Sequence, residues 1–540
     1  MTGTPLLTGI PNTVPNGTSD IATFGASGVT DVINTNVIVN LDSLVLSPGA
    51  PQYTITALDN IALYGIGIVN NSGMMQSFVT GAFLLKNGAT AGNMTNFSNV
   101  GGFVSFNDSS SAGSATIDLS DNMYQAHLDF FDSSTAADAT INASGGAEVS
   151  VLDNATGGNA AFTISGESFL GVVDNATTDH ASATCIGGDQ YFGAGIFFQQ
   201  FGSGGEGTFT AVGASSSGEK GSYIEFDGSA TAANATFVIG GGLGAGLAAT
   251  TLTFFNTTTA GAANITANGG VGGSDGGAII FTNKSKGGTA SITLTGNSEL
   301  DISTHNAPGV TIGSLSGKGS VLLGANTLTI GSNNQSTSFS GVIQDTGGVT
   351  KAGRGTLTLT GSNLYTGNTT VTGGVLEVSN RRGSATGTGN VNVQTGTLGG
   401  KGIVSSTVTI GTGSGRGAFL APTARTNVQA TLTIQSALIF NADATYAYTF
   451  RAKRNRARTD TVIANGVTIN SGAMIALSGQ TQGRLTTGLT LTLISNTSAN
   501  LISGTFSNLP DGGIVTINGN NFQASYSGGD GNDLTLTVVP

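Results

Sequence analysis

Tryptophan is missing from this 540-residue sequence, and cysteine occurs once, at Cys185. A single cysteine excludes an internal disulfide bond and any metal site built from several thiolates. Without tryptophan, and with only 9 tyrosines, the chain offers little aromatic surface for stacking against sugar rings. The three histidines, His127, His180 and His305, show none of the spacings that are typical of a metal-binding motif.

Charge is also scarce, since charged residues make up 9% of the chain against about 25% in typical soluble domains. The net charge of −12 disfavours nucleic acid and anionic membrane surfaces as partners, because both require a basic face. No apolar run approaches the roughly 18 to 20 residues of a membrane-spanning helix. The first residues, Met1 to Leu7, lack the basic and apolar regions of a signal peptide. This leaves two alternatives: a signal has been removed, or export does not follow the classical route.

What the sequence does contain is a repeat between about residues 85 and 292. In each copy an apolar residue is followed eleven positions later by another, with Ser, Thr, Asn, Asp, Gly and Ala between them. The clearest copies are 106–117, 130–141, 226–237, 254–265 and 281–292, and weaker ones begin near Leu85, Val151, Val173 and Phe198. Successive copies start about 21 to 28 residues apart, which is the length of one solenoid coil. The repeat therefore predicts stacked coils with an apolar interior.

Three short alternating runs follow in the stretch from Ser338 to Asn380. They are Thr356–Thr360, Thr369–Thr372 and Val375–Val378, and glycine and asparagine separate them. Alternation of this kind predicts strands with one buried face. Because no helical segment connects the strands, they too favour a β-solenoid.

The same stretch resembles the passenger-associated transport repeat of bacterial autotransporter-like surface proteins. The resemblance rests on Lys351, Gly353, Gly355–Leu359, Gly361, Asn363, Tyr365–Gly367, Thr369, Val371, Gly373, Gly374 and Leu376, after a lead-in at Phe339–Asp345. It implies an all-β chain folded as a right-handed parallel β-helix and secreted or displayed at the bacterial surface. Catalysis is not implied by the resemblance. No alternating strands of a membrane barrel follow, so a passenger-type portion is expected.

These patterns predict four segments. Residues 1–80 form an N-terminal cap or opening β segment, 81–300 the repeats, 301–440 a solenoid that includes the transport repeat at about 338–380, and 441–540 a divergent C-terminal β section. In the last segment, five of the eight residues from Arg451 to Arg458 are basic. The run is interpreted as a solvated turn or, alternatively, as a docking patch for an acidic neighbour.

Two patterns could carry chemistry. Gly528–Leu534 fits the calcium-binding nonapeptide of β-rolls, with Asp530 and Asp533 as candidate ligands, although ion sharing needs tandem copies and a Gly-rich hairpin is the alternative. No other cofactor or metal is predicted. Carboxylates that could supply acid and base are Asp118, Asp121, Asp129 and Asp132, or Asp174, Asp179 and Asp189. Most occupy turn positions of the repeat, where Asp is ordinary turn chemistry, so no catalytic residue is assigned.

The sequence therefore predicts a non-enzymatic, exported β-solenoid with a structural or adhesive role. Such a protein would bind through many weak contacts along one face. Partners would be surface glycans or further copies of the chain, joined end to end into filaments through exposed strand edges. The alternative is an extracellular β-helix protein that binds or degrades polysaccharide.

Overall fold

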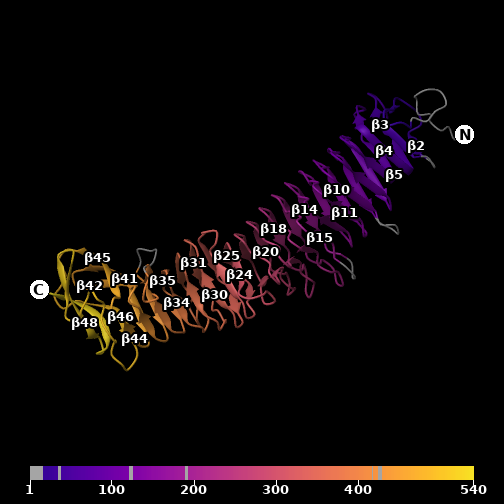
Figure 1. Ribbon diagram of the computed structural model, residues 1–540. Helices are drawn as coiled ribbons and strands as arrows, with labels where there is room; N and C mark the ends of the chain where they lie inside the picture. Colours follow the sequence, from indigo (N-terminus) through magenta and orange to yellow (C-terminus); the bar gives the residue numbers. More distant parts are fainter. Residues whose placement is uncertain (1–15, 35–37, 121–125, 189–192, 416, 424–428) are drawn as a thin grey trace. The chain divides into compact units, whose positions relative to one another are not determined.

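The computed structural model describes residues 16–34, 38–120, 126–188, 193–415, 417–423 and 429–540 (Figure 1). All regular elements in these residues are β-strands, and most neighbouring strands pair in parallel, coil upon coil. The predicted all-β solenoid is thereby confirmed. The chain divides into two compact units. Unit 1 comprises Met1–Lys286 with Gly296–Ser298, and unit 2 comprises Gly287–Thr295 with Glu299–Pro540.

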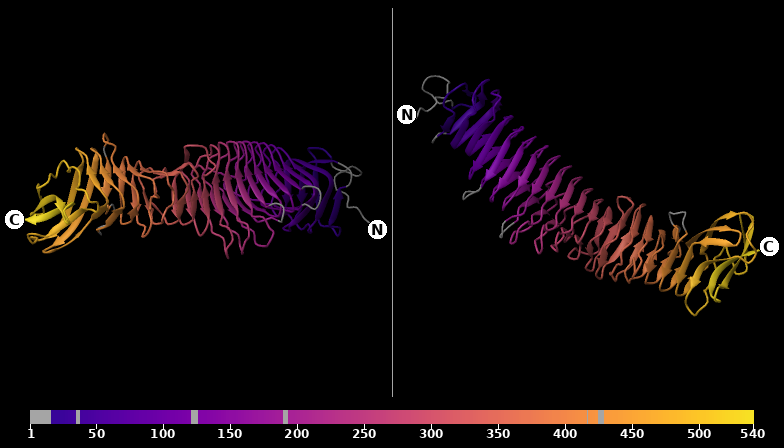
Figure 2. Two further views of the ribbon diagram at one scale, coloured as in Figure 1. Left: turned by 90° about the horizontal axis from the view of Figure 1, so that it is seen from below. Right: turned by 180° about the vertical axis from the view of Figure 1, so that it is seen from behind.

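Unit 1 begins with six strands of unequal length and continues as two rows of short strands that alternate along the chain (Figures 1 and 2). The opening strands are β1 (Ile21–Phe24), β2 (Asp31–Asn34), β3 (Val39–Leu46), β4 (Thr54–Asn70), β5 (Gln76–Leu85) and β6 (Thr95–Val100). The first row contains β7 (Phe103–Phe106), β9 (His127–Phe130), β11 (Glu148–Val151), β13 (Phe169–Val172), β15 (Gly195–Phe198), β17 (Tyr223–Phe226), β19 (Thr251–Phe254) and β21 (Ala278–Phe281). The second row contains β8 (Thr116–Ser120), β10 (Thr140–Ser144), β12 (Ala161–Ile164), β14 (Ser182–Cys185), β16 (Thr208–Ala211), β18 (Thr236–Ile239) and β20 (Asn264–Ala267).

The last residue of each first-row strand points into the interior and stacks on its equivalent in the next coil. The ring of Phe226 lies 4.4 Å from that of Phe198 and 4.9 Å from that of Phe254, centroid to centroid, with the planes nearly parallel. Val172 pairs in register with Phe198, so the weak copy expected near Val173 begins one residue earlier. That difference matters because a shift of one residue turns a strand's side chain to the opposite face.

Unit 2 is built from further parallel rows. One contains β22 (Ser291–Leu294), β25 (Ser314–Gly317), β28 (Thr337–Phe339), β31 (Thr356–Leu359), β33 (Val375–Val378), β35 (Gly396–Gly400), β38 (Ala418–Ala421), β41 (Ala444–Lys453) and β45 (Met474–Gln482). Beside it run β23 (Glu299–Asp301), β26 (Ser320–Leu322) and β29 (Val342–Gln344). A separate sheet contains β24 (Gly309–Ile312), β27 (Thr327–Ile330), β30 (Gly348–Lys351), β32 (Thr369–Val371), β34 (Val391–Val393), β37 (Val408–Ile410), β40 (Leu438–Phe440) and β44 (Val467–Ile469).

Toward the C-terminus the pairing in unit 2 changes from parallel to antiparallel. A third sheet orders β36 (Ile403–Val404), β39 (Thr431–Ile434), β43 (Thr461–Ala464), β46 (Thr490–Asn496), β49 (Asp533–Val539), β48 (Asn520–Gly528) and β47 (Ile514–Ile517). Its pairs from β46 onward are antiparallel. The strand β42 (Arg456–Thr459) folds back on β41 as an antiparallel hairpin. The C-terminal section therefore diverges from the solenoid pattern.

The transport repeat places Asn363, Tyr365 and Thr369 inside unit 2, where each of these three polar side chains has a hydrogen-bond partner. The side-chain oxygen of Asn363 accepts the N–H of Ile343 at 2.8 Å. The hydroxyl of Tyr365 lies 2.6 Å from that of Thr369, and all three of these repeat residues are buried. Buried polar groups need such partners, so these residues hold the neighbouring coils in register.

Candidate functional site

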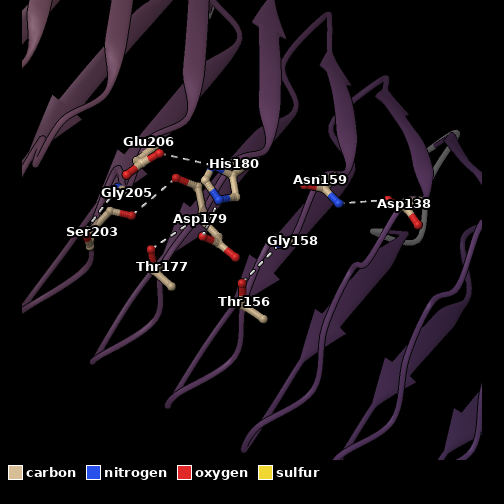
Figure 3. A network of polar contacts seen from close by, with 11 residues as sticks. Asp138, Thr156, Gly158, Asn159, Thr177, Asp179, His180, Ser203, Gly205 and Glu206 are labelled. Carbon is tan, nitrogen blue, oxygen red and sulfur yellow. Dashed lines mark hydrogen bonds and ion pairs between the residues drawn. The ribbon is translucent and has the colours of Figure 1, made fainter.

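A row of hydroxyl side chains runs along one turn of the coils in unit 1. Successive members form bridges from coil to coil, and the row comprises Thr90, Ser111, Thr135, Thr156, Thr177, Ser203, Thr231 and Thr259. Each hydroxyl accepts the backbone N–H two residues later, at 3.1 Å for Thr156 and Gly158 and for Thr177 and Asp179 (Figure 3). These are hydroxyl turns, in which a side chain replaces a backbone acceptor.

The residue two positions after each hydroxyl has a left-handed backbone. Gly158 has a φ of 58°, and a side chain there would approach the carbonyl oxygen of Ala137 to 2.8 Å. The equivalent residue of the next coil is Asp179, with a φ of 53°. The tight turn sends the next residue outward, and that residue forms a second row of polar side chains.

This outer row contains Asp138, Asn159, His180 and Glu206 in four successive coils (Figure 3). The amide of Asn159 donates to the carboxylate of Asp138 at 3.0 Å. A ring nitrogen of His180 lies 3.5 Å from the Glu206 carboxylate, and the other lies 3.6 Å from Asp179. The side chains of both His180 pairs are at least half exposed, so the pairs contribute little to stability and remain available to an external partner.

The other turn of unit 1 carries a row of aspartates that link neighbouring coils. The Asp132 carboxylate accepts the N–H of Asp108 at 3.0 Å, and the Asp153 carboxylate accepts the N–H of Asp132 at 3.1 Å. Asp174 has the same left-handed backbone one coil later. The structure therefore places three of the candidate acid–base residues, Asp132, Asp174 and Asp179, in turns.

The remaining carboxylate candidates are scattered. Asp118 lies on β8, where it accepts the side-chain amide of Asn142 at 2.8 Å. Asp129 lies on β9, and burial raises its pKa to about 6, with the positive charge of His127 opposing the rise and the charge of Glu148 adding to it. His127 itself lies 3.3 Å from Glu148. Asp121 and Asp189 lie outside the described residues.

The described part of the chain contains no group of three or more His, Cys, Asp or Glu side chains arranged to hold a metal ion. Asp533 lies at the hairpin between β48 and β49, where its carboxylate accepts the N–H of Asn496 at 2.8 Å. Burial raises the pKa of Asp533, with this hydrogen bond opposing the rise and the charge of Asp530 adding to it. Calcium binding by Asp530 and Asp533 stays a prediction.

A small cavity opens on the outer face of unit 1 beside β15 and β17. Its volume is about 210 Å³, and it is lined by Phe197, Gln199, Glu225, Asp227, Phe255 and Asn256. We refer to it as the aromatic–carboxylate cavity. Burial and the charge of Asp227 raise the pKa of Glu225. The Asp227 carboxylate accepts the N–H of Gly228 at 2.6 Å and the side-chain amide of Asn256.

Aromatic rings extend this cavity along the first row of strands. The Phe197 ring lies 5.9 Å from Phe169 and 5.4 Å from Tyr223, each in an edge-to-face arrangement. The sequence held a signal for these outward rings in the doublets Phe197-Phe198 and Phe254-Phe255. Because neighbouring residues of an extended chain point to opposite sides, one ring of each doublet lies outside the stack. Flat rings beside carboxylate and amide groups suit a ligand with both apolar faces and hydroxyl groups.

Comparisons with known proteins agree with the sequence patterns. Residues 349–378 match the family described as the passenger-associated transport repeat. A stretch of 91 residues is 41% identical to the adhesin BmaC autotransporter of Brucella suis biovar 1 (strain 1330), and it covers 17% of this chain and 3% of that protein. Among solved structures, the chain is similar to the Hap adhesin of Haemophilus influenzae with a TM-score of 0.30 and 12% identity, covering 94% of this chain and 64% of that one.

The predicted resemblance to the passenger-associated transport repeat is confirmed for residues 349–378. Among the described residues, no helix is long and apolar enough to cross a membrane.

Proposed function

We propose that this chain is an adhesive portion of an exported bacterial surface protein, and that the outer face of unit 1 binds glycans. The observation that carries the proposal is the aromatic–carboxylate cavity, in which Phe197 and Phe255 lie beside the acceptor groups of Glu225 and Asp227. The 41% identity to a protein described as an adhesin supports the same class of function.

The cavity is smaller than the roughly 300 to 1,000 Å³ of a typical ligand pocket, so it fits one sugar unit and binds it weakly. Weak contacts gain strength when a chain-like ligand engages several at once. The outer polar row offers further partners, because Asp138, Asn159, His180 and Glu206 recur from coil to coil (Figure 3). Adhesion would thus come from repeated contacts rather than from one deep site.

We assign no catalytic step to the cavity. Glycoside hydrolysis needs two carboxyl groups that flank the scissile bond on opposite sides. Glu225 and Asp227 instead lie two positions apart in one coil, so they approach a ligand from the same side of the cavity. The alternative function, degradation of a polysaccharide, therefore has less support than binding. Filament formation by end-to-end association also stays a prediction, which sedimentation at several concentrations would test.

The experiment is glycan binding by the full chain and three variants. Phe197→Ala removes the central ring, and Glu225→Gln removes the charge while keeping the shape. Phe201→Ala is the control, because this ring is 62% exposed and does not line the cavity. We expect the first two variants to lose about tenfold in affinity, or about 1.4 kcal/mol, and the control to bind as the parent does. Equal binding by all four chains would show that the cavity is not part of the glycan-binding site. Release of shorter sugars from the glycan would favour the enzymatic alternative.

A further inference from the structure

A basic hairpin interrupts unit 2, and its register gathers positive charge on one face. In the antiparallel pair of β41 and β42, Arg451 lies opposite Arg458, and Lys453 lies opposite Arg456. Residues two apart on a strand, and residues directly opposite on the neighbouring strand, point to the same side of a sheet. The four cations therefore share one face. The other face is apolar, since the Phe450 and Ala452 side chains are buried.

This arrangement is unfavourable on its own, because like charges directly opposite each other destabilise a sheet. All four side chains are exposed, and none of them forms an ion pair with an acidic side chain among the described residues. Asp460, the acidic residue that follows the hairpin in sequence, does not neutralise the positive charge of this face. It is fully buried and accepts hydrogen bonds from Thr449, from the N–H of Ala430 and from the Thr423 hydroxyl.

The cationic face borders a hollow of about 930 Å³, which we call the basic groove. Its lining comprises residues 451–453 and 455–459 of the hairpin, Gln480, Thr481 and Gln482 of β45, and Leu489, Thr490 and Thr492. β45 runs parallel to β41, with Gln480 beside Arg451 and Gln482 beside Lys453. Amide and hydroxyl groups thus flank the cations, and no aromatic ring lines the groove.

We propose that the basic groove binds an anionic polysaccharide, whose sulfate or carboxylate groups pair with the arginines. Guanidinium groups suit this chemistry because they donate two parallel hydrogen bonds to one such group. The neighbouring glutamines and threonines suit sugar hydroxyls. Single-stranded nucleic acid is disfavoured because it is held by stacking on aromatic rings, and none lines the groove. The proposal does not depend on the aromatic–carboxylate cavity, which lies in unit 1.

The test uses heparin as a sulfated polysaccharide, with dextran as a neutral one, and measures binding of the full chain in about 50 mM and about 200 mM NaCl. The double variant Arg456→Gln with Arg458→Gln removes two groove cations. A matched control, Arg381→Gln with Arg382→Gln, removes two exposed arginines of another loop. We expect heparin binding that weakens with salt, a loss of about tenfold or more in the groove variant, and a change below about twofold in the control.

The thermal unfolding midpoint of the groove variant should stay level or rise, because the substitutions relieve repulsion between like charges. Phe197→Ala should leave heparin binding unchanged, which separates this proposal from the glycan site of unit 1. Three results would overturn the proposal: no heparin binding in low salt, equal losses in groove and control variants, or duplex DNA binding that is as tight and equally sensitive to the groove variant.

Discussion

The two units solve the same packing problem in different ways. Unit 1 repeats one set of side chains in each coil, with stacked Phe rings inside, hydroxyl turns at the corners and polar groups outside. Unit 2 keeps the parallel rows but fixes them with polar groups that occur once, such as Asn363, Tyr365 and Asp460. In unit 1, a substitution should therefore destabilise the neighbouring coils in a similar way wherever it is made. In unit 2, the loss of stability depends on which residue is replaced.

The largest loss is expected for Phe226→Ala in the interior stack of unit 1. The ring is fully buried between Phe198 and Phe254, so its removal leaves a cavity between three coils. We expect a local loss of about 4 kcal/mol. Hydrogen exchange should show faster opening of β15, β17 and β19, with unit 2 unchanged. Uniform destabilisation of both units would contradict the picture of independent coils.

A smaller loss of stability, confined to the region around Asp460, is expected for Asp460→Ala in unit 2. The substitution leaves the N–H groups of Ala430 and Thr449 without their acceptor, at a cost of about 3 kcal/mol. Denaturant unfolding and hydrogen exchange of β41 and β43 would measure it. Asp460→Asn should recover part of the loss, since one oxygen remains. A change below about 1 kcal/mol would show that the buried carboxylate does not hold this region.

The pH dependence of unit 1 should reveal the buried Asp129. Its folded-state pKa is raised from 3.8 to about 6, so the folded state binds more protons than the unfolded state between these values. Its contribution to stability therefore falls as the pH rises through this window. Asp129→Asn removes the charge, and we expect a higher unfolding midpoint at pH 7.5 but little change at pH 4.

His127, Glu148 and Ser150 surround this carboxylate, and the charges of His127 and Glu148 act on its pKa in opposite directions. The control is Asp153→Asn, because Asp153 lies in a turn rather than on a strand and is only partly buried. If Asp129→Asn raises the unfolding midpoint equally at pH 7.5 and at pH 4, removal of the buried charge is not the cause of the stabilisation.

The smallest effect is expected for Thr156→Val, which removes one hydroxyl turn and keeps the size of the side chain. The lost acceptor served the N–H of Gly158, and the cost should be about 0.5 to 1 kcal/mol because the turn is partly solvated. Thr163→Val on β12 is the matched control, with an expected change within about 0.5 kcal/mol. Equal changes in stability for the two substitutions would show that the hydroxyl row does not stabilise the turns.

The sequence predicts the fold well where one residue type always occupies the same place in the coil. Phe106, Phe130, Phe226, Phe254 and Phe281 mark the interior of their coils, and the structure buries all five. The weak copy near Val173 was placed one residue late, because Val172 and Val173 are both apolar and only the register tells them apart.

The candidate site was harder to predict because its residues come from different coils. Glu225 and Asp227 are more than 25 positions away from Phe255, Asn256, Phe197 and Gln199, and only the parallel register brings these groups to one cavity. The basic run was visible in the sequence. Its antiparallel register, which sets Arg451 opposite Arg458, was not.

Glycan binding by the immobilised full chain, measured at low and high glycan surface density, tests the proposed adhesive function most directly. Many weak contacts along unit 1 predict that apparent affinity rises steeply with glycan density, and that Phe197→Ala weakens binding at every density while Phe201→Ala does not. Tight binding that is independent of density, or no binding to any glycan at the highest density, would contradict the account.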